Sequence, residues 1–440
     1  MTMIEGGKER EISPREHTNN TQHVMDTATV CVLTIGVLLR LGALQMVPNM
    51  SNVLDQFVLF STPINSYRSL NEGIFLLSSK MNPYSHGEII HHPPLLLWFF
   101  NVLKSSHIED NFNTNLFYSL MDLFMCLQFI KMSKKLNGEN SISSFKLACF
   151  HMFNPFTLLT TFSKSTHILN NFIVVSVCSC LVQDQVDLAL ILLAISSYLT
   201  YYTWSLVIPI AYYTYRTYGC ARLFRSIGAF IVSLAILLGI SYRLSNNSLN
   251  FISLCYVTIL KFKKITPNSG LWWYFFTEIF DFFNDFYLAV FNIYGLILIL
   301  PLSMRFIRAG NKMNLLFVTW ITLGIINFSR AYPVLADYSL FYSSVVLFSE
   351  YYANLKFSPI VSYLALFVVL LQAPTFYVVW MVLNSGNANF FYAIGLALAL
   401  VQGLILGDFL WSFIQSEYYS KQGLEKCGKE PVALPKLTQI

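Results

Sequence analysis

Residues 27–47 read TATVCVLTIGVLLRLGALQMV, an apolar run in which Arg40 is the single charged side chain. A helix needs about 20 mostly apolar residues to cross the hydrocarbon core of a bilayer. The run is too long for the apolar part of a signal peptide, and no small-residue cleavage site follows it. It therefore predicts a membrane-spanning helix that stays in the mature chain.

Further apolar runs repeat this pattern along the 440-residue chain. They begin near Asn113, Ile142, Ile168, Leu188, Ser205, Ser226, Tyr287, Met313, Asp337, Phe357 and Phe390. Together with the first run they predict about twelve crossings. The composition agrees, because only 12% of the residues are charged, against about 25% in a soluble domain. A soluble globule is excluded, and we expect an all-α polytopic membrane protein.

The distribution of basic residues predicts the orientation of the chain. Lys and Arg gather on alternate loops, with 17 on one side and 9 on the other. Because cytoplasmic loops carry the excess of positive charge, both termini are assigned to the cytoplasm. The expected organisation is a polar N-terminal extension (1–26), a multi-spanning domain (27–413) and a cytoplasmic tail (414–440). The net charge of +5 reports topology rather than an acidic ligand.

The opposite side receives the loop 48–112 and the region 243–285, which are expected to be lumenal. Within this loop, residues 94–104 are apolar but too short to cross, so they predict an interfacial or re-entrant helix. His86, Glu88, His91 and His92 lie within seven residues. A zinc site, a structural loop and a ligand contact all stay open there, although adjacent histidines followed by two prolines do not favour a metal. We expect no bound metal, and no disulfide framework from the eight cysteines.

Two polar sequences interrupt the apolar pattern in the first half of the chain and at its centre. Asn154-Pro155 breaks a hydrophobic run that ends at Lys164. Freed backbone groups and this lysine suit an anionic head group, whereas a simple kink and a lysine reaching the interface are the alternatives. The second sequence, KFKKITPNSGLWWYFFTEIFDFFNDF (261–286), holds aromatic side chains that suit a membrane–water interface. Its candidates are Asn268, Trp272, Trp273 and Tyr274.

Acidic residues follow this aromatic block at spacings of three and four. On one helix, Glu278, Asp281 and Asp285 would share a face. A solvated face is the alternative to a site that meets a metal or the cations of a partner.

The last two polar sequences lie between apolar runs nearer the C-terminus. Arg330 and Asp337 flank a Tyr-Pro turn, where an ion pair is expected to hold the turn. Asn384, Asn387 and Asn389 precede Tyr392 and offer amide groups above an aromatic band. Such a rim suits the hydroxyls of a glycan or the phosphate of a lipid, and a plain turn is the alternative.

Catalytic motifs are missing where an enzyme of this architecture needs them. A polytopic chain with a long first lumenal loop resembles the glycosyltransferase-C-like enzymes that use dolichol-linked sugars. The resemblance implies paired acidic residues soon after the first span, but Asp55 stands alone until Glu72. No Ser-His-Asp, Cys-His, P-loop or HExxH arrangement has a credible context. We therefore expect no catalytic residue and no cofactor in this chain.

Longer strings carry a more specific resemblance. ITPNSGLWWYFFTEIF (265–280), NPFTLLTTFSKST (154–166), YPVLAD (332–337), NANFFYAI (387–394) and NPYS (82–85) resemble the PIG-U family, the multi-spanning subunit of glycosylphosphatidylinositol (GPI) transamidase. This resemblance implies membership of an endoplasmic reticulum complex whose cysteine nucleophile belongs to a caspase-like partner. It also implies a fold related to the dolichol-dependent mannosyltransferases.

Three hypotheses follow from the sequence. In the first, a non-catalytic subunit binds GPI in a groove of Asn154–Lys164, Thr266–Tyr274 and Asn384–Tyr392 and holds the other subunits, among membrane lipids and without nucleic acid. In the second, the chain is an active dolichol-phosphate-mannose-dependent mannosyltransferase that uses Asp55. The third is a solute carrier, for which Arg40 is the one obvious charge at mid-membrane.

Overall fold

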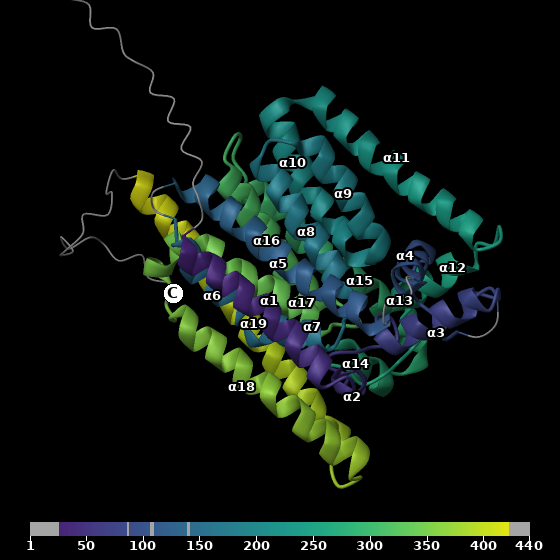
Figure 1. Ribbon diagram of the computed structural model, residues 1–440. Helices are drawn as coiled ribbons and strands as arrows, with labels where there is room; N and C mark the ends of the chain where they lie inside the picture. Colours follow the sequence, from purple (N-terminus) through teal and green to yellow (C-terminus); the bar gives the residue numbers. More distant parts are fainter. Residues whose placement is uncertain (1–25, 86–87, 106–109, 139–140, 422–440) are drawn as a thin grey trace, which may run out of the picture.

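The computed structural model describes residues 26–85, 88–105, 110–138 and 141–421, and every regular element among them is helical. The helices lie side by side in one bundle (Figure 1). His86, most of the expected N-terminal extension (1–25) and residues 422–440 of the expected tail lie outside the described residues. The all-helical fold class is confirmed for the part of the chain that the structure covers.

Seven of the described helices are long and apolar enough to cross a membrane. They are α1 (Thr27–Met46), α5 (Asp110–Asn137), α11 (Cys220–Leu244), α15 (Asn284–Phe306), α16 (Lys312–Ser329), α18 (Pro359–Tyr377) and α19 (Ala388–Lys421). Each coincides with an apolar run expected from the sequence. A π-helical turn, η6 (Val378–Val382), extends α18. The boundary expected at residue 413 falls inside α19.

The other five apolar runs form shorter helical segments, and the run that begins near Ile142 is divided into two of them, α6 and α7. They are α6 (Ser144–Met152), α7 (Pro155–Phe162), α8 (His167–Val182), α9 (Val186–Leu199), the 3₁₀ segment η2 (Tyr201–Leu206) with α10 (Val207–Tyr218), and α17 (Leu335–Ser344) with the 3₁₀ segment η5 (Val345–Asn354). At 1.5 Å per residue, α8 is about 24 Å long, less than the roughly 30 Å hydrocarbon core. The structure thus shows seven helices of spanning length among the described residues. The expected number of about twelve crossings stays a prediction.

Short helices make up the two regions expected to be lumenal. They are α2 (Met50–Leu54), α3 (Tyr67–Ser78), α4 (Pro94–Ser105), α12 (Asn250–Ile252), the π-helical turn η3 (Ser253–Val257), α13 (Thr258–Leu260), α14 (Trp272–Glu278) and the 3₁₀ turn η4 (Asp281–Phe283). The helix expected over 94–104 is confirmed as α4. Asn82 Nδ2 donates to the Ser245 carbonyl (3.2 Å), and His91 Nδ1 bonds to that of Leu254 (2.7 Å), so the two regions pack together.

The expectation of three carboxylates on one helix face is wrong. α14 ends at Glu278, and the extended residues Ile279 and Phe280 separate it from η4. Asp281 therefore starts a new turn and Asp285 belongs to α15, so the helical register is broken twice. All three side chains are exposed, as the solvated alternative requires.

Ion pairs gather at the end of the bundle that the basic residues assign to the cytoplasm. Glu417 pairs with Arg305, Arg308 and Lys421, while Asp187 pairs with Arg222 and Arg225. Figure 1 shows the start of α1 and the end of α19 at the same end of the bundle. The two described chain ends therefore lie on one side, as the sequence predicts.

Arg40 and Asp122 form a buried ion pair between α1 and α5. Their relative exposures are 0% and 1%, and Arg40 Nε lies 2.8 Å from Asp122 Oδ2. The other guanidinium nitrogens donate to the carbonyls of Met152 (2.9 Å) and Gly36 (3.1 Å) and to the Thr157 hydroxyl (3.3 Å). Every nitrogen of Arg40 is occupied, so this charge offers no open site to a transported solute.

The helix break at Asn154 is confirmed. α6 ends at Met152, and Asn154 caps α7 by accepting a hydrogen bond from the Phe156 amide (2.9 Å). Pro155 occupies the first turn of α7, where its missing N–H costs no hydrogen bond. The chain therefore changes direction here inside the bundle, and α6 and α7 do not form one continuous helix.

Candidate functional site

An aromatic cluster joins three elements at the end of the bundle expected to be lumenal. We name it the aromatic rim, and it comprises Trp273, Tyr274, Trp380, Phe391 and Tyr392. Trp273 of α14 stacks on Trp380 of η6 at 5.7 Å between ring centroids and lies 6.0 Å from Phe391 of α19. Tyr274 stacks on Tyr392 at 4.6 Å. The rim therefore unites two of the three segments of the predicted groove.

Asparagine side chains line the exposed edge of this rim. The Tyr274 hydroxyl donates to Asn389 Oδ1, and Asn387 Oδ1 accepts from the Asn389 amide (2.6 Å). Asn384, Asn387 and Asn389 are all exposed. Exposed amides beside stacked rings can bond a ligand's hydroxyl or phosphate oxygens while the rings contact its apolar part.

α19 approaches the turn before α14 closely enough to need a glycine. A Cβ on Gly395 would stand 3.1 Å from the Ser269 carbonyl oxygen. The Tyr392 hydroxyl, one turn earlier on α19, donates to the Leu271 carbonyl (3.3 Å). These two contacts fix α19 against the turn and so set the spacing of the rim.

Trp273 carries a buried polar group that the protein does not satisfy. The residue is 3% exposed, and its Nε1–H has no hydrogen-bond partner among the described residues. A buried indole N–H normally finds an acceptor. Trp273 therefore presents a donor within the rim.

Asn268 and Trp272 make hydrogen bonds that hold the turn before α14. Asn268 Oδ1 accepts from the Gly270 amide (2.7 Å), and its Nδ2 donates to the Ala331 carbonyl (3.1 Å). Trp272 is 1% exposed and donates to the Ser329 carbonyl (3.0 Å). Both residues hold the turn that carries Trp273 and Tyr274 of the rim.

Asn154 and Lys164 lie apart from the rim and share no hydrogen bond or ring contact with it. Asn154 Oδ1 accepts from the Tyr363 hydroxyl of α18, while Lys164 Nζ stands 5.4 Å from the centre of the Tyr67 ring. Lys164 is 4% exposed and pairs with no described acid. Burial lowers the pKa of Lys164 to about 8. A buried cation of this kind favours an anionic group beside it.

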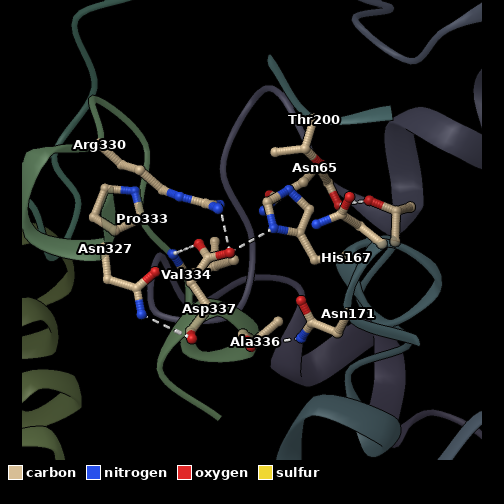
Figure 2. A network of polar contacts seen from close by, with 12 residues as sticks. Asn65, His167, Asn171, Thr200, Asn327, Arg330, Pro333, Val334, Ala336 and Asp337 are labelled. Carbon is tan, nitrogen blue, oxygen red and sulfur yellow. Dashed lines mark hydrogen bonds and ion pairs between the residues drawn. The ribbon is translucent and has the colours of Figure 1, made fainter. Parts of the chain in front are cut away.

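The expected ion pair between Arg330 and Asp337 is confirmed and belongs to a larger network. Figure 2 shows Arg330 and His167 converging on Asp337, with distances of 2.5 Å and 2.9 Å. Asp337 Oδ2 also accepts from the Val334 amide (3.1 Å). Burial raises the pKa of Asp337, but the Arg330 guanidinium and His167 outweigh it and hold this pKa below its usual value. The network joins the turn after α16 to the start of α8.

Sequence reasoning missed several members of these clusters. His167, Trp380 and Tyr67 stand in ordinary apolar or polar surroundings, and nothing in their spacing points to their partners. Helical periodicity reports which side of a helix is apolar, but not which distant helix lies opposite. Only a contact between segments far apart in the sequence reveals them.

No group of three potential metal ligands occurs among the described residues, and His86 of the candidate cluster lies outside them. His92 Nε2 bonds to the Ser66 carbonyl (3.0 Å), and both rings are 2% exposed. Burial lowers the pKa of both, that of His92 to about 4. The histidines are therefore neutral residues that hold the loop, which favours the structural alternative.

Asp55 has a structural role of its own. Its carboxylate accepts from the Ser66 hydroxyl (3.0 Å) and from the amides of Tyr67 and Arg68 (3.2 Å each). These bonds satisfy the free amides at the start of α3, as capping carboxylates do. The structure therefore gives Asp55 a helix-capping role.

Comparison with known proteins agrees with this arrangement. A family model described as GPI transamidase subunit PIG-U matches residues 34–398. The GPI transamidase component GAB1 of Saccharomyces cerevisiae is 36% identical over 400 residues, which cover 90% of this chain and 96% of the yeast protein. The GPI-anchor transamidase component PIGU of Homo sapiens is 26% identical over 436 residues, covering 92% and 98%. Both the extent of the match and the identity show that this chain belongs to the PIG-U family of GPI transamidase subunits.

Proposed function

We propose that this chain is a non-catalytic subunit of a GPI transamidase in the endoplasmic reticulum membrane, where it binds the GPI glycolipid and holds the other subunits. Family membership supports the complex, because the relatives are named as its components. The cysteine nucleophile then resides on a caspase-like partner. Cys255, in the region expected to be lumenal, is buried.

The observation that carries glycolipid binding is the aromatic rim with its exposed asparagines. Stacked rings at a membrane interface accept the apolar part of an amphiphile, and amides bond the hydroxyls of its glycan. The unpartnered Nε1–H of Trp273 adds a donor for an oxygen of the head group. Lys164 supplies a separate contact for a phosphate, away from the rim.

Trp273→Phe tests the ligand contact directly. The variant keeps an aromatic ring but removes an N–H that bonds nothing in the described protein, so the subunit should assemble and melt as before. Loss of one hydrogen bond to the ligand, about 1 kcal/mol, lowers affinity roughly fivefold. The measurement is photo-crosslinking of a photoactivatable GPI to the purified complex, titrated with competing unlabelled GPI.

Asn387→Ala provides a second test at the exposed edge, with Asn52→Ala as its matched control. Asn52 is an exposed asparagine of the loop 48–112, and its side chain makes no hydrogen bond to another described residue. GPI labelling should fall for Asn387→Ala and stay unchanged for Asn52→Ala. Unchanged labelling of both Trp273→Phe and Asn387→Ala, in complexes of normal composition, would overturn glycolipid binding at the rim.

The place in the complex is tested separately. Affinity purification through a tag on this chain, in mild detergent, should recover a caspase-like protease in stoichiometric amount. Purification of the chain without such a protease contradicts the scaffolding role, whatever the crosslinking shows.

A further inference from the structure

A long apolar groove lies at the opposite end of α18 from the aromatic rim. Its volume is about 550 Å³, within the range of about 300–1,000 Å³ of small-molecule sites. The walls come from α6, the start of α7, η5 and the first half of α18. The residues that line it include Lys146, Phe150, Tyr352, Ile360, Tyr363 and Leu364.

Aromatic side chains join α6 and α7 to α18 at the groove. Phe150 and Phe156 meet Tyr363 at 5.9 Å and 5.1 Å, and Phe156 meets Phe367 at 6.2 Å. Phe150, Tyr363 and Phe367 line the floor of the groove, and Phe156 is buried against the last two. Above the floor, the break at Asn154 ends α6, so no continuous helix covers the space beside α18.

The walls offer almost nothing polar to an occupant. The Tyr352 hydroxyl donates to the Val345 carbonyl (3.0 Å), and the Tyr363 hydroxyl donates to Asn154. Both hydroxyls are thus used within the protein. Ile360 and Leu364 are 77% and 59% exposed on α18, a helix of spanning length. An occupant of the shaft must therefore be apolar and reach it from within the bilayer.

One end of the groove carries a charge. Lys146, in the first turn of α6, is the single charged residue among the described lining residues, and its ammonium group pairs with no described acid. Pro359 begins α18 at the same end, three residues after Lys356. The distribution of basic residues assigns this end to the cytoplasm. A cation at the mouth of an apolar shaft complements an anionic amphiphile.

The length of the shaft agrees with a lipid of one leaflet. From Pro359 to Phe367 α18 rises about 12 Å, close to the roughly 15 Å of half a hydrocarbon core. We propose that the groove binds an anionic glycerophospholipid of the cytoplasmic leaflet, with an acyl chain along Tyr363 and Leu364 and the phosphate at Lys146. This site is distinct from the rim and does not depend on GPI binding.

The experiment compares two lipids with the same photoactivatable acyl chain in nanodiscs that hold the purified complex. One probe is phosphatidylserine and the other phosphatidylcholine, each in a phosphatidylcholine background. Wild-type peptides covering 142–155 and 359–367 should be labelled by phosphatidylserine about fivefold more than by phosphatidylcholine. This ratio corresponds to about 1 kcal/mol for one lysine near an anionic head group.

Two variants separate the parts of the site. Lys146→Gln should reduce the ratio to about one, whereas Lys134→Gln, an exposed lysine outside the groove, should not change it. Leu364→Trp fills the shaft and should lower labelling by both probes. Leu371, which is 64% exposed on α18, lies outside the groove, so Leu371→Trp should not change the labelling.

Several results would overturn the proposal. Equal labelling of wild type by the two probes removes the anionic preference, and unaltered labelling in Leu364→Trp removes the shaft. Groove peptides that no lipid labels, but that crosslink to another subunit, show that a partner helix covers the site. Complexes of each variant are first checked for normal subunit composition, so that a loss of labelling is not a loss of assembly.

Discussion

Removal of the Arg40 charge provides the sharpest test of how the bundle is held together. Arg40→Met replaces the guanidinium with an apolar side chain of similar length. Asp122 would then remain buried at 1% exposure, with the Thr161 hydroxyl as its remaining side-chain partner. The carbonyl at the end of α6, Met152, would also lose its donor.

The expected loss follows from the burial of both partners. Breaking a buried ion pair by removing one member costs about 3–5 kcal/mol, because the other charge is left uncompensated. At roughly 2 °C per kcal/mol for a chain of this size, the midpoint of thermal unfolding should fall by about 6–10 °C. Replacing both partners, as in Arg40→Met with Asp122→Leu, removes the uncompensated charge and should recover at least half of this loss.

The assay is the loss of monodisperse complex on heating, followed by fluorescence-detected size-exclusion chromatography in one detergent. Arg243→Met, which removes an exposed arginine at the end of α11, is the matched control and should shift the midpoint little. Two results would refute the reasoning: wild-type stability in Arg40→Met, or a double variant less stable than either single one.

Three further predictions concern the expected lumenal side. The pKa of His92 is about 4 in the folded protein, against 6.5 in the unfolded chain, so the unfolded chain binds a proton first as the pH falls. About 3 kcal/mol of the stability present above pH 6.5 is therefore lost as the pH falls toward 4. Thermal melts at a series of pH values should show this loss, and His92→Gln should reduce the pH dependence. Asp55→Asn should cost about 1 kcal/mol through the cap of α3 yet leave the mannose content of GPI precursors unchanged, and loss of mannose transfer would restore the enzyme hypothesis. Gly395→Val should push α19 from the Ser269 carbonyl and reduce GPI crosslinking, whereas Gly403→Val, where a Cβ has open space, should not; equal labelling of the two variants would contradict the role of this contact.

Much of the fold was predictable because its signal is local. An apolar run of sufficient length forms a helix in a bilayer whatever its neighbours are. Hence all seven long helices begin close to the predicted positions. The helix break at Asn154-Pro155 and the ion pair between Arg330 and Asp337 also occur as predicted. The five other runs form shorter or divided helices, because composition does not reveal where a helix ends inside a protein-lined interior.

The candidate site was only partly predictable, for the same reason. Trp273 and Tyr392 were identified as interface residues, but their contact depends on how α14 and α19 pack. Trp272 and Asn268 belong to the same polar and aromatic sequence, yet the turn of the chain directs both side chains inward. There their N–H groups donate to the backbone carbonyls of Ser329 and Ala331. Side-chain chemistry was readable from the sequence, whereas accessibility required the structure.

The shortness of α8 and α9 has a consequence for the surrounding bilayer. At about 24 and 21 Å, the two helices are shorter than the roughly 30 Å core, and the turn between them bears Asp184, which pairs with Lys312. Hydrophobic mismatch of this size is relieved by local thinning of the membrane. During biosynthesis neither helix is long enough to be a stable insertion unit alone, so α8 and α9 are expected to enter the lipid as a hairpin sheltered by α5 and α11. A thinned annulus beside this hairpin would shorten the distance between the two faces of the membrane at the subunit.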